Sequence, residues 1–148
     1  MLTEDDIVAI TRRILASCAP LAVGIFGSYA IGAASESSDL DLFVIKAGTG
    51  SCATTRHFRC LLSDVLHPLD LHVFTAEQFE ASAYRRFSFT WVLARHARIY
   101  HWTEAAERLI PSLVGAPRAD SIARLPAVDG PVRVVDILFS APRAERDI

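Results

Sequence analysis

The chain has 148 residues, of which 51% are hydrophobic and 22% charged, a composition typical of one globular domain with its own core and not of a disordered protein. Its net charge of -2 argues against direct nucleic-acid binding through a broad basic surface. The acidic N-terminus, and the lack of an apolar run near the roughly 20 residues of a membrane span, predict a cytoplasmic protein that makes no membrane contact.

The first predicted elements are a helix and a buried strand. Thr3 caps a helix with an acidic first turn and apolar residues at helical spacing, and Pro20 stops it. The apolar run 21–26 is typical of a buried strand that ends at Gly27. The Ala-rich segment 29–34 predicts a further helix directly after this turn.

The next strand begins with Asp39-Leu40-Asp41 and continues as an apolar run to Ile45. Because strand side chains alternate, Asp39 and Asp41 share one face, roughly 6.6 Å apart at about 3.3 Å per residue. Two such carboxylates raise each other's pKa unless a cation compensates their charge. The pair therefore predicts a metal platform, and a hydrated Mg²⁺ would remove the conflict.

A loop rich in Gly, Ser and Thr over 48–55 precedes a second amphipathic helix, which Pro68 ends. The third strand candidate covers 69–74 and places Asp70 and His72 on one face. His72 is as well explained by a structural role as by a substrate contact. The apolar face of the preceding helix is predicted to contain Phe58, Leu61, Leu62, Val65 and Leu66.

The remaining elements are mostly helical. Thr75 caps a helix in the capping-box manner, a helix covers 87–95, a short strand covers 98–101, and a last helix runs from Thr103 to Pro111. Core packing is the expectation for most of the alternating aromatic residues Phe87, Phe89 and Trp91. A solvated surface is the expectation for most of the arginines Arg85, Arg86, Arg95 and Arg98.

The character of the chain changes after residue 114. We predict one domain over 1–114 and a Pro-rich extension over 115–148, with one candidate strand at 132–139. The cysteines Cys18, Cys52 and Cys60 are odd in number and lack C-x-x-C spacing, which indicates reduced thiols. Of these, Cys18 and Cys60 are expected in the core.

Three strand carboxylates are what two-metal phosphoryl transfer requires. Asp39 and Asp41 can bridge two Mg²⁺ ions, and Asp70 can ligate the second ion and accept the proton of the nucleophile, provided that its strand lies beside the first. At the other end of the site, Gly27 lets the backbone come close to a phosphate. Ser28 offers N–H groups and a hydroxyl to an anion.

Segments 26–32 (FGSYAIG) and 38–44 (SDLDLFV) together resemble the signature of the DNA polymerase β-type nucleotidyltransferase superfamily, in its minimal bacterial (MNT) branch. The likeness extends over about residues 5–114 in element order. It implies an α+β fold, with a mixed β-sheet flanked by helices as in the polymerase β palm. It also implies ATP as donor substrate, Mg²⁺ as cofactor and an enzyme that transfers a nucleoside monophosphate to a hydroxyl group. The residues implicated are Gly27, Ser28 and Ser38 at the nucleotide and Asp39, Asp41 and Asp70 at the metals.

The resemblance leaves the acceptor open. Some members of this branch are antitoxins that adenylylate a HEPN-type toxin partner, and others modify aminoglycosides. A catalytically inactive module that neutralises a partner by binding alone is the alternative from a non-enzyme class. A glycosyltransferase that uses Asp-x-Asp on a sugar nucleotide is less attractive, because it leaves Asp70 and the Gly27-Ser28 turn without a role.

Overall fold

The computed structural model describes residues 1–48 and 55–119. Four strands form one sheet in the order β3-β2-β1-β4, in which β3 pairs with β2 in parallel and the other neighbours are antiparallel. The predicted mixed sheet of an α+β fold is therefore confirmed. The strands are β1 (Ala22–Phe26), β2 (Leu40–Lys46), β3 (Leu69–Thr75) and β4 (Arg98–Trp102). The helices are α1 (Glu4–Ser17), α2 (Thr55–Leu61), α3 (Ala76–Ala83), α4 (Phe89–His96) and α5 (Glu104–Leu109), with 3₁₀ turns η1 (Gly27–Tyr29) and η2 (Pro111–Leu113).

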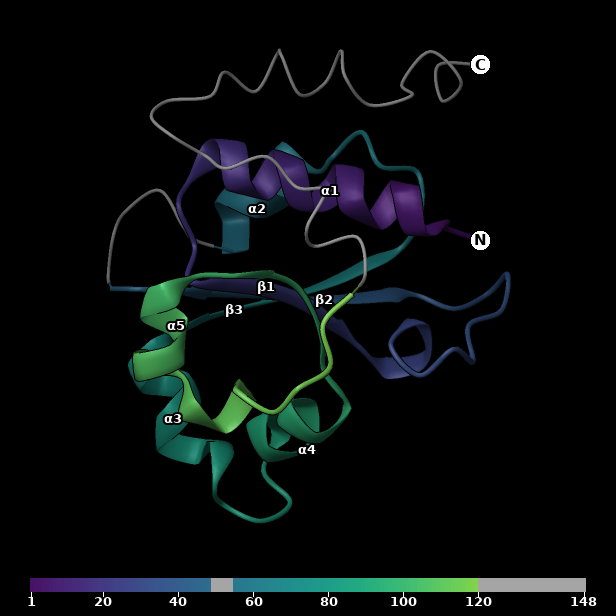
Figure 1. The fold of residues 1–148 in the computed structure, drawn as a ribbon. Coiled ribbons are helices and arrows are strands. Elements are labelled where there is room, and N and C mark those ends of the chain that lie inside the picture. The colour runs from purple at the N-terminus through teal and green to yellow at the C-terminus, as the bar shows by residue number, and fades with distance from the viewer. Residues whose placement is uncertain (49–54, 120–148) are drawn as a thin grey trace.

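Helices cover both faces of the sheet (Figure 1). α1 and α2 lie on one face, and α3, α4 and α5 lie on the other. The side chains of β2 alternate between the two cores: Leu42 packs with the α1 side, whereas Phe43 and Ile45 pack with the α3 side. Asp41 is on the same side of the strand as Phe43, so the α3–α4 face of the sheet carries the acidic residue.

The N-terminal helix begins as the sequence predicts. The Thr3 side chain accepts a hydrogen bond from the Asp6 N–H, and the Asp6 carboxylate accepts one from the Thr3 N–H, which completes a capping box. The Tyr100 hydroxyl donates to Glu4 Oε2 at 2.6 Å and ties the start of α1 to β4. Buried Arg13 forms an ion pair with Asp64, which ties α1 to the segment after α2.

Two helix predictions differ from the structure. Residues 29–34 form no helix: the amides of Ala30 and Ile31 both donate to the Gly27 carbonyl, and the chain then reaches Gly32 at φ +74°. This left-handed residue ends the turn, so only η1 remains. The second helix ends at Leu61 instead of continuing to Leu66, whose side chain is 85% exposed.

The aromatic residues before and within α4 also differ from expectation. Phe87 and Phe89 are 74% and 50% exposed, so the predicted core packing is wrong for both. The helix starts at Phe89 because Ser88 caps it: the Ser88 Oγ accepts a hydrogen bond from the Trp91 N–H at 3.1 Å. Phe87 is thereby left outside the helix. Cys60 is exposed as well, contrary to the core position predicted for it.

The described chain continues past the predicted domain boundary. Arg118 forms a parallel bridge with Ile99 of β4, and Ala119 is buried in the α1-side core. The start of the predicted extension thus packs on the edge of the sheet, and the boundary at residue 114 stays a prediction. The candidate strand at 132–139 lies outside the described residues. Over 1–48 and 55–119, no helix is both long and apolar enough to traverse a bilayer.

Candidate active site

Asp41 and Asp70 lie side by side on adjacent strands. The parallel register of β2 and β3 pairs Asp41 directly with Asp70, so both point to the α3–α4 face. Burial raises the pKa of Asp41, and the negative charges of Asp70 and Asp39 raise it further, while His72 lowers it. Two acids are therefore held together against their mutual repulsion.

The Gly27 backbone lies against this pair. Phe26 at the end of β1 is paired in register with Asp41, and the chain turns at Gly27 with φ +72°. A Cβ at this position would be 2.2 Å from Asp41 Oδ2. Only glycine therefore fits between the turn and the carboxylate, which places the two parts of the sequence motif in direct contact.

Asp39 stands apart from the other two acids. It precedes β2, which begins at Leu40, and its side chain is exposed. It is still near enough for its charge to raise the pKa of Asp41. In residues 1–48 and 55–119, no three His, Cys, Asp or Glu side chains are grouped so that they could hold a metal ion as they stand. The role of Asp39 as a metal ligand stays a prediction.

The donor chemistry of the Asp41–Asp70 pair fits a divalent cation. Carboxylate oxygens are the hard ligands that Mg²⁺ prefers. A cation would also offset the two neighbouring negative charges, whose repulsion adds to the effect of burial in raising the pKa of Asp41. The residues present at this point thus fit a divalent cation, and Asp41 and Asp70 are the ones that would hold it.

His72 completes the acidic end of the site. Its Nε2 is 3.2 Å from Asp70 Oδ2, and its ring centroid is 4.8 Å from that of Phe89 and 5.5 Å from that of Phe26. The imidazole is therefore held between aromatic rings while one nitrogen faces the carboxylate. The alternation along β3 predicts that His72 shares a face with Asp70, but its aromatic contacts come from β1 and α4 and could not be derived from the strand pattern.

The two predicted nucleotide-binding serines have different surroundings. Ser28 lies in η1 and lines a pocket beside the acidic pair. The Ser38 Oγ accepts a hydrogen bond from the Ser35 N–H at 2.8 Å, and the Ser38 carbonyl is 2.8 Å from His67 Nε2. Ser38 thus shapes the loop before Asp39. None of its contacts within the described chain reaches Ser28 or Gly27.

The pocket at Ser28 has a volume of about 310 Å³. This volume is at the small end of the range for small-molecule sites. Its walls are mainly apolar, with one imidazole, so it suits the flat face of a ring more than a phosphate. The lining residues are Phe26, Gly27, Ser28, Ile31, Val92 and His96.

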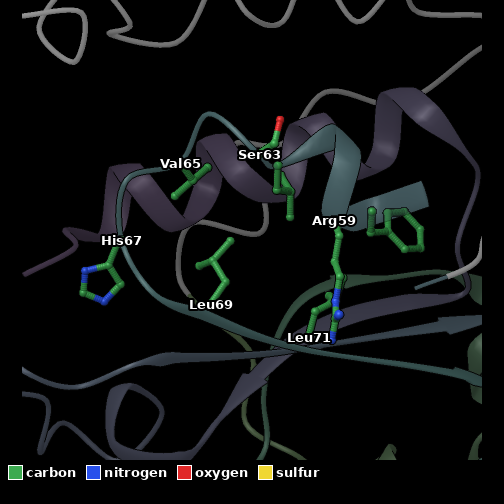
Figure 2. A pocket seen from close by; sticks show the side chains of 8 residues that line it. Arg59, Ser63, Val65, His67, Leu69 and Leu71 are labelled. Carbon is green, nitrogen blue, oxygen red and sulfur yellow. The ribbon is translucent and has the colours of Figure 1, made fainter. Parts of the chain in front are cut away.

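A second pocket, of about 190 Å³, lies between α2 and β3 (Figure 2). Leu69 and Leu71 line it and alternate with Asp70 and His72 along β3, so it opens on the opposite face of the sheet from the acidic pair. Figure 2 shows Arg59 reaching from α2 toward Leu71. No carboxylate lines this pocket, and it is therefore separate from the candidate active site.

Comparisons with known proteins bear on the family of the chain. The family model of the nucleotidyltransferase domain matches residues 8–142. No curated protein matches the chain. Among solved structures, a "Crystal structure of the toxin-antitoxin with AMP-PNP" aligns over 98% of this chain and 94% of that chain, at 16% identity and a TM-score of 0.49. Because the family model spans most of the sequence, including the Gly27-Ser28 turn and all three aspartates, the chain belongs to the nucleotidyltransferase domain family.

Proposed function

We propose that this protein is a Mg²⁺-dependent nucleotidyltransferase that acts in the cytoplasm and transfers AMP from ATP to a hydroxyl group. The acceptor is a protein partner of the HEPN type, as the sequence resemblance suggests, or a small molecule. The observation that carries the proposal is the in-register pair of Asp41 and Asp70, packed directly against the Gly27 backbone. A turn whose backbone can come close to a phosphate thus lies beside two carboxylates that can bind a metal.

The ATP donor would lie partly in the pocket and partly at the acidic pair. The apolar walls formed by Phe26, Ile31 and Val92 accept the base. The Gly27-Ser28 turn lies between these walls and Asp41, where the phosphates would follow. Asp41 and Asp70 would hold the metal, and Asp39 would be a further ligand. When bound, Mg²⁺ supplies positive charge that offsets the phosphate oxygens and favours ionisation of the attacking hydroxyl.

The reaction is an in-line displacement at the α-phosphorus. The acceptor oxygen forms a bond to this phosphorus, the bond from phosphorus to the α–β bridging oxygen breaks, and pyrophosphate leaves. The hydroxyl proton passes to the carboxylate of Asp70, which is 57% exposed and therefore accessible to an acceptor. The imidazole of His72, at 3.2 Å, keeps this carboxylate oriented.

Transfer of label from α-³²P-ATP tests the proposal. The full chain is incubated with Mg²⁺ and either a HEPN-family protein or an aminoglycoside, and we expect label on one of the two. Asp41→Asn and Asp70→Asn should each lower the rate by about 100-fold or more, because each removes a metal ligand. Asp5→Asn, the same change at an exposed position in the first turn of α1, should leave the rate unchanged. Full activity of Asp41→Asn would contradict the proposal.

A second candidate function is neutralisation of a partner by binding alone. It is favoured by the observation that the described side chains form no group of three metal ligands. The same protein set separates the two candidates. A complex that forms and inhibits equally well with wild type and Asp41→Asn, without any transfer of label, would support the binding module.

A further inference from the structure

The segment that joins α3 to α4, together with α4 itself, exposes four large apolar side chains. We call Tyr84, Phe87, Phe89 and Val92 the α4 rim; their exposed fractions are 67%, 74%, 50% and 42%. Ile31, which is 64% exposed, lines the same pocket as Val92. Exposed apolar patches on soluble proteins often mark sites of interaction. The rim is therefore a candidate interaction surface.

Phe87 is held on this surface in a strained conformation. Its φ is +67°, and it is the one residue other than glycine with a positive φ in the described chain. A bulky side chain in this region is an outlier. The turn is fixed by short contacts, because the Ser88 Oγ donates to the Ser82 carbonyl at 2.6 Å and the Arg85 N–H donates to the same carbonyl at 3.0 Å. The strain is thus built into an ordered turn that presents the ring to solvent.

One arginine lies over the exposed ring, and two more are close to it in the chain. The Arg86 guanidinium is 5.0 Å from the Phe87 ring centroid, and the Arg95 guanidinium is 4.1 Å from that of Trp91, which in turn is 5.2 Å from Phe87. Arg85 is exposed beside them. Within residues 1–48 and 55–119, none of these three arginines forms an ion pair. Their positive charge is available to an acidic surface.

The rim is continuous with the candidate active site. The Phe89 ring is 4.8 Å from that of His72, whose Nε2 faces Asp70, and Val92 lines the pocket at the Gly27-Ser28 turn. A molecule docked on the rim would therefore have its nearest groups next to Asp70. This is where an acceptor hydroxyl has to arrive.

We propose that the α4 rim docks the acceptor, and that the acceptor is a protein with an acidic surface that receives the Phe87 ring. This inference rests on the proposed function and adds the chemistry of its partner. Aromatic side chains and arginine are the residues that dominate the energetics of protein interfaces. The net charge of -2 disfavours a nucleic-acid acceptor.

Binding of a defined acidic polypeptide tests the docking surface without reliance on catalysis. The probes are a fluorescently labelled random copolymer of glutamate and tyrosine, a lysine–tyrosine copolymer and single-stranded poly(U), measured by anisotropy with the full chain. We expect the glutamate–tyrosine copolymer to bind best. Phe87→Gly and the double variant Arg85→Glu/Arg86→Glu should each weaken this binding at least tenfold. Arg56→Glu, an exposed cation on α2 across the sheet, should not.

The substitution Phe87→Gly separates docking from a structural role. Glycine adopts a positive φ without strain, so this variant should unfold at a higher temperature while it binds the copolymer more weakly. A lower unfolding temperature with unchanged binding would overturn the proposal. So would rim-dependent binding of poly(U) alone, which would assign the surface to nucleic acid. Binding of Mg²⁺ and ATP is measured separately by calorimetry. Loss of this binding would count against the proposed transferase function and not against the docking surface.

Discussion

Gly27 and Gly32 share a left-handed backbone conformation but differ in their surroundings. Their φ angles are +72° and +74°. A Cβ on Gly27 would be 2.2 Å from Asp41 Oδ2, whereas a Cβ on Gly32 would meet nothing within 4 Å. Both positions favour glycine because of their positive φ, but only Gly27 also needs it to make room for the Asp41 carboxylate.

Substitution of the two glycines by alanine tests this distinction. Both variants should lose about 1 kcal/mol in the free energy of unfolding, because alanine is disfavoured in the left-handed region. Gly27→Ala should in addition displace the Asp41 carboxylate and weaken Mg²⁺ binding by about tenfold or more, as measured by calorimetry. Gly32→Ala should retain wild-type affinity. Equal Mg²⁺ affinity in the two variants would show that the contact with Asp41 is not needed.

At the scale of elements, the Tyr100 hydroxyl links β4 to the start of α1. Tyr100 is fully buried, and it donates to Glu4 Oε2 at 2.6 Å. Burial, together with the hydrogen bond to Glu4, raises the pKa of Tyr100 well above its usual value. The phenol thus stays protonated and keeps its role as donor throughout the neutral range.

Removal of this one hydroxyl should loosen α1 from the sheet. We expect Tyr100→Phe to lower the free energy of unfolding by about 2 kcal/mol, since a buried donor to a charged acceptor is lost. Tyr84→Phe is the matched control, because Tyr84 is exposed and its variant should stay within about 0.5 kcal/mol of wild type. Urea denaturation measures both. A change in Tyr100→Phe as small as that of the control would mean that α1 docks through its apolar face alone.

The elements differ in how far the sequence predicts them. The four strands follow from apolar runs bounded by turn residues, and the caps at Thr3 and Thr75 follow from local hydrogen-bond chemistry. The helix predicted over 29–34 fails because the left-handed Gly32 outweighs the helix propensity of alanine. The exposure of Phe87 is also missed, since the periodicity of an amphipathic segment does not reveal where Ser88 starts the helix.

The candidate site, too, is only partly predictable from the sequence. Alternation along β3 correctly places Asp70 and His72 on one face, whereas Asp39, which is predicted to share a face with Asp41, precedes the start of β2 at Leu40. From the sequence alone, it could only be assumed that β2 and β3 are neighbours in the sheet. Their parallel register depends on how the chain between them packs, which is a long-range property. The direct contact between Gly27 and Asp41 likewise appears only once β1 and β2 are paired.

For the whole molecule, stability should depend on pH through His101. Burial lowers the pKa of His101, and a hydrogen bond with the Pro20 carbonyl offsets part of this effect. In the unfolded chain the imidazole takes up a proton near pH 6.5, before the folded protein does. The free energy of unfolding should therefore be constant above this pH and fall as the pH decreases below it, by at most about 1.4 kcal/mol per pH unit from this residue.

Urea denaturation at pH 7.5 and pH 5.5 measures this dependence. His101→Gln should lose less stability between the two pH values than wild type, because glutamine carries no proton to take up. His96→Gln, which removes an exposed imidazole, is the control and should follow the wild-type curve. A His101→Gln protein with the full wild-type loss would assign the acid sensitivity to other groups.

The position of β3 at the outside of the sheet has a consequence for the size of the substrate. Asp70 is carried by this outermost strand and is 57% exposed, whereas Asp41 is on an inner strand. Within the described chain, a hydroxyl group can reach Asp70 from the side, without entering a tunnel. Under the proposed function, this exposed edge would admit a side chain of a folded protein as well as a small molecule.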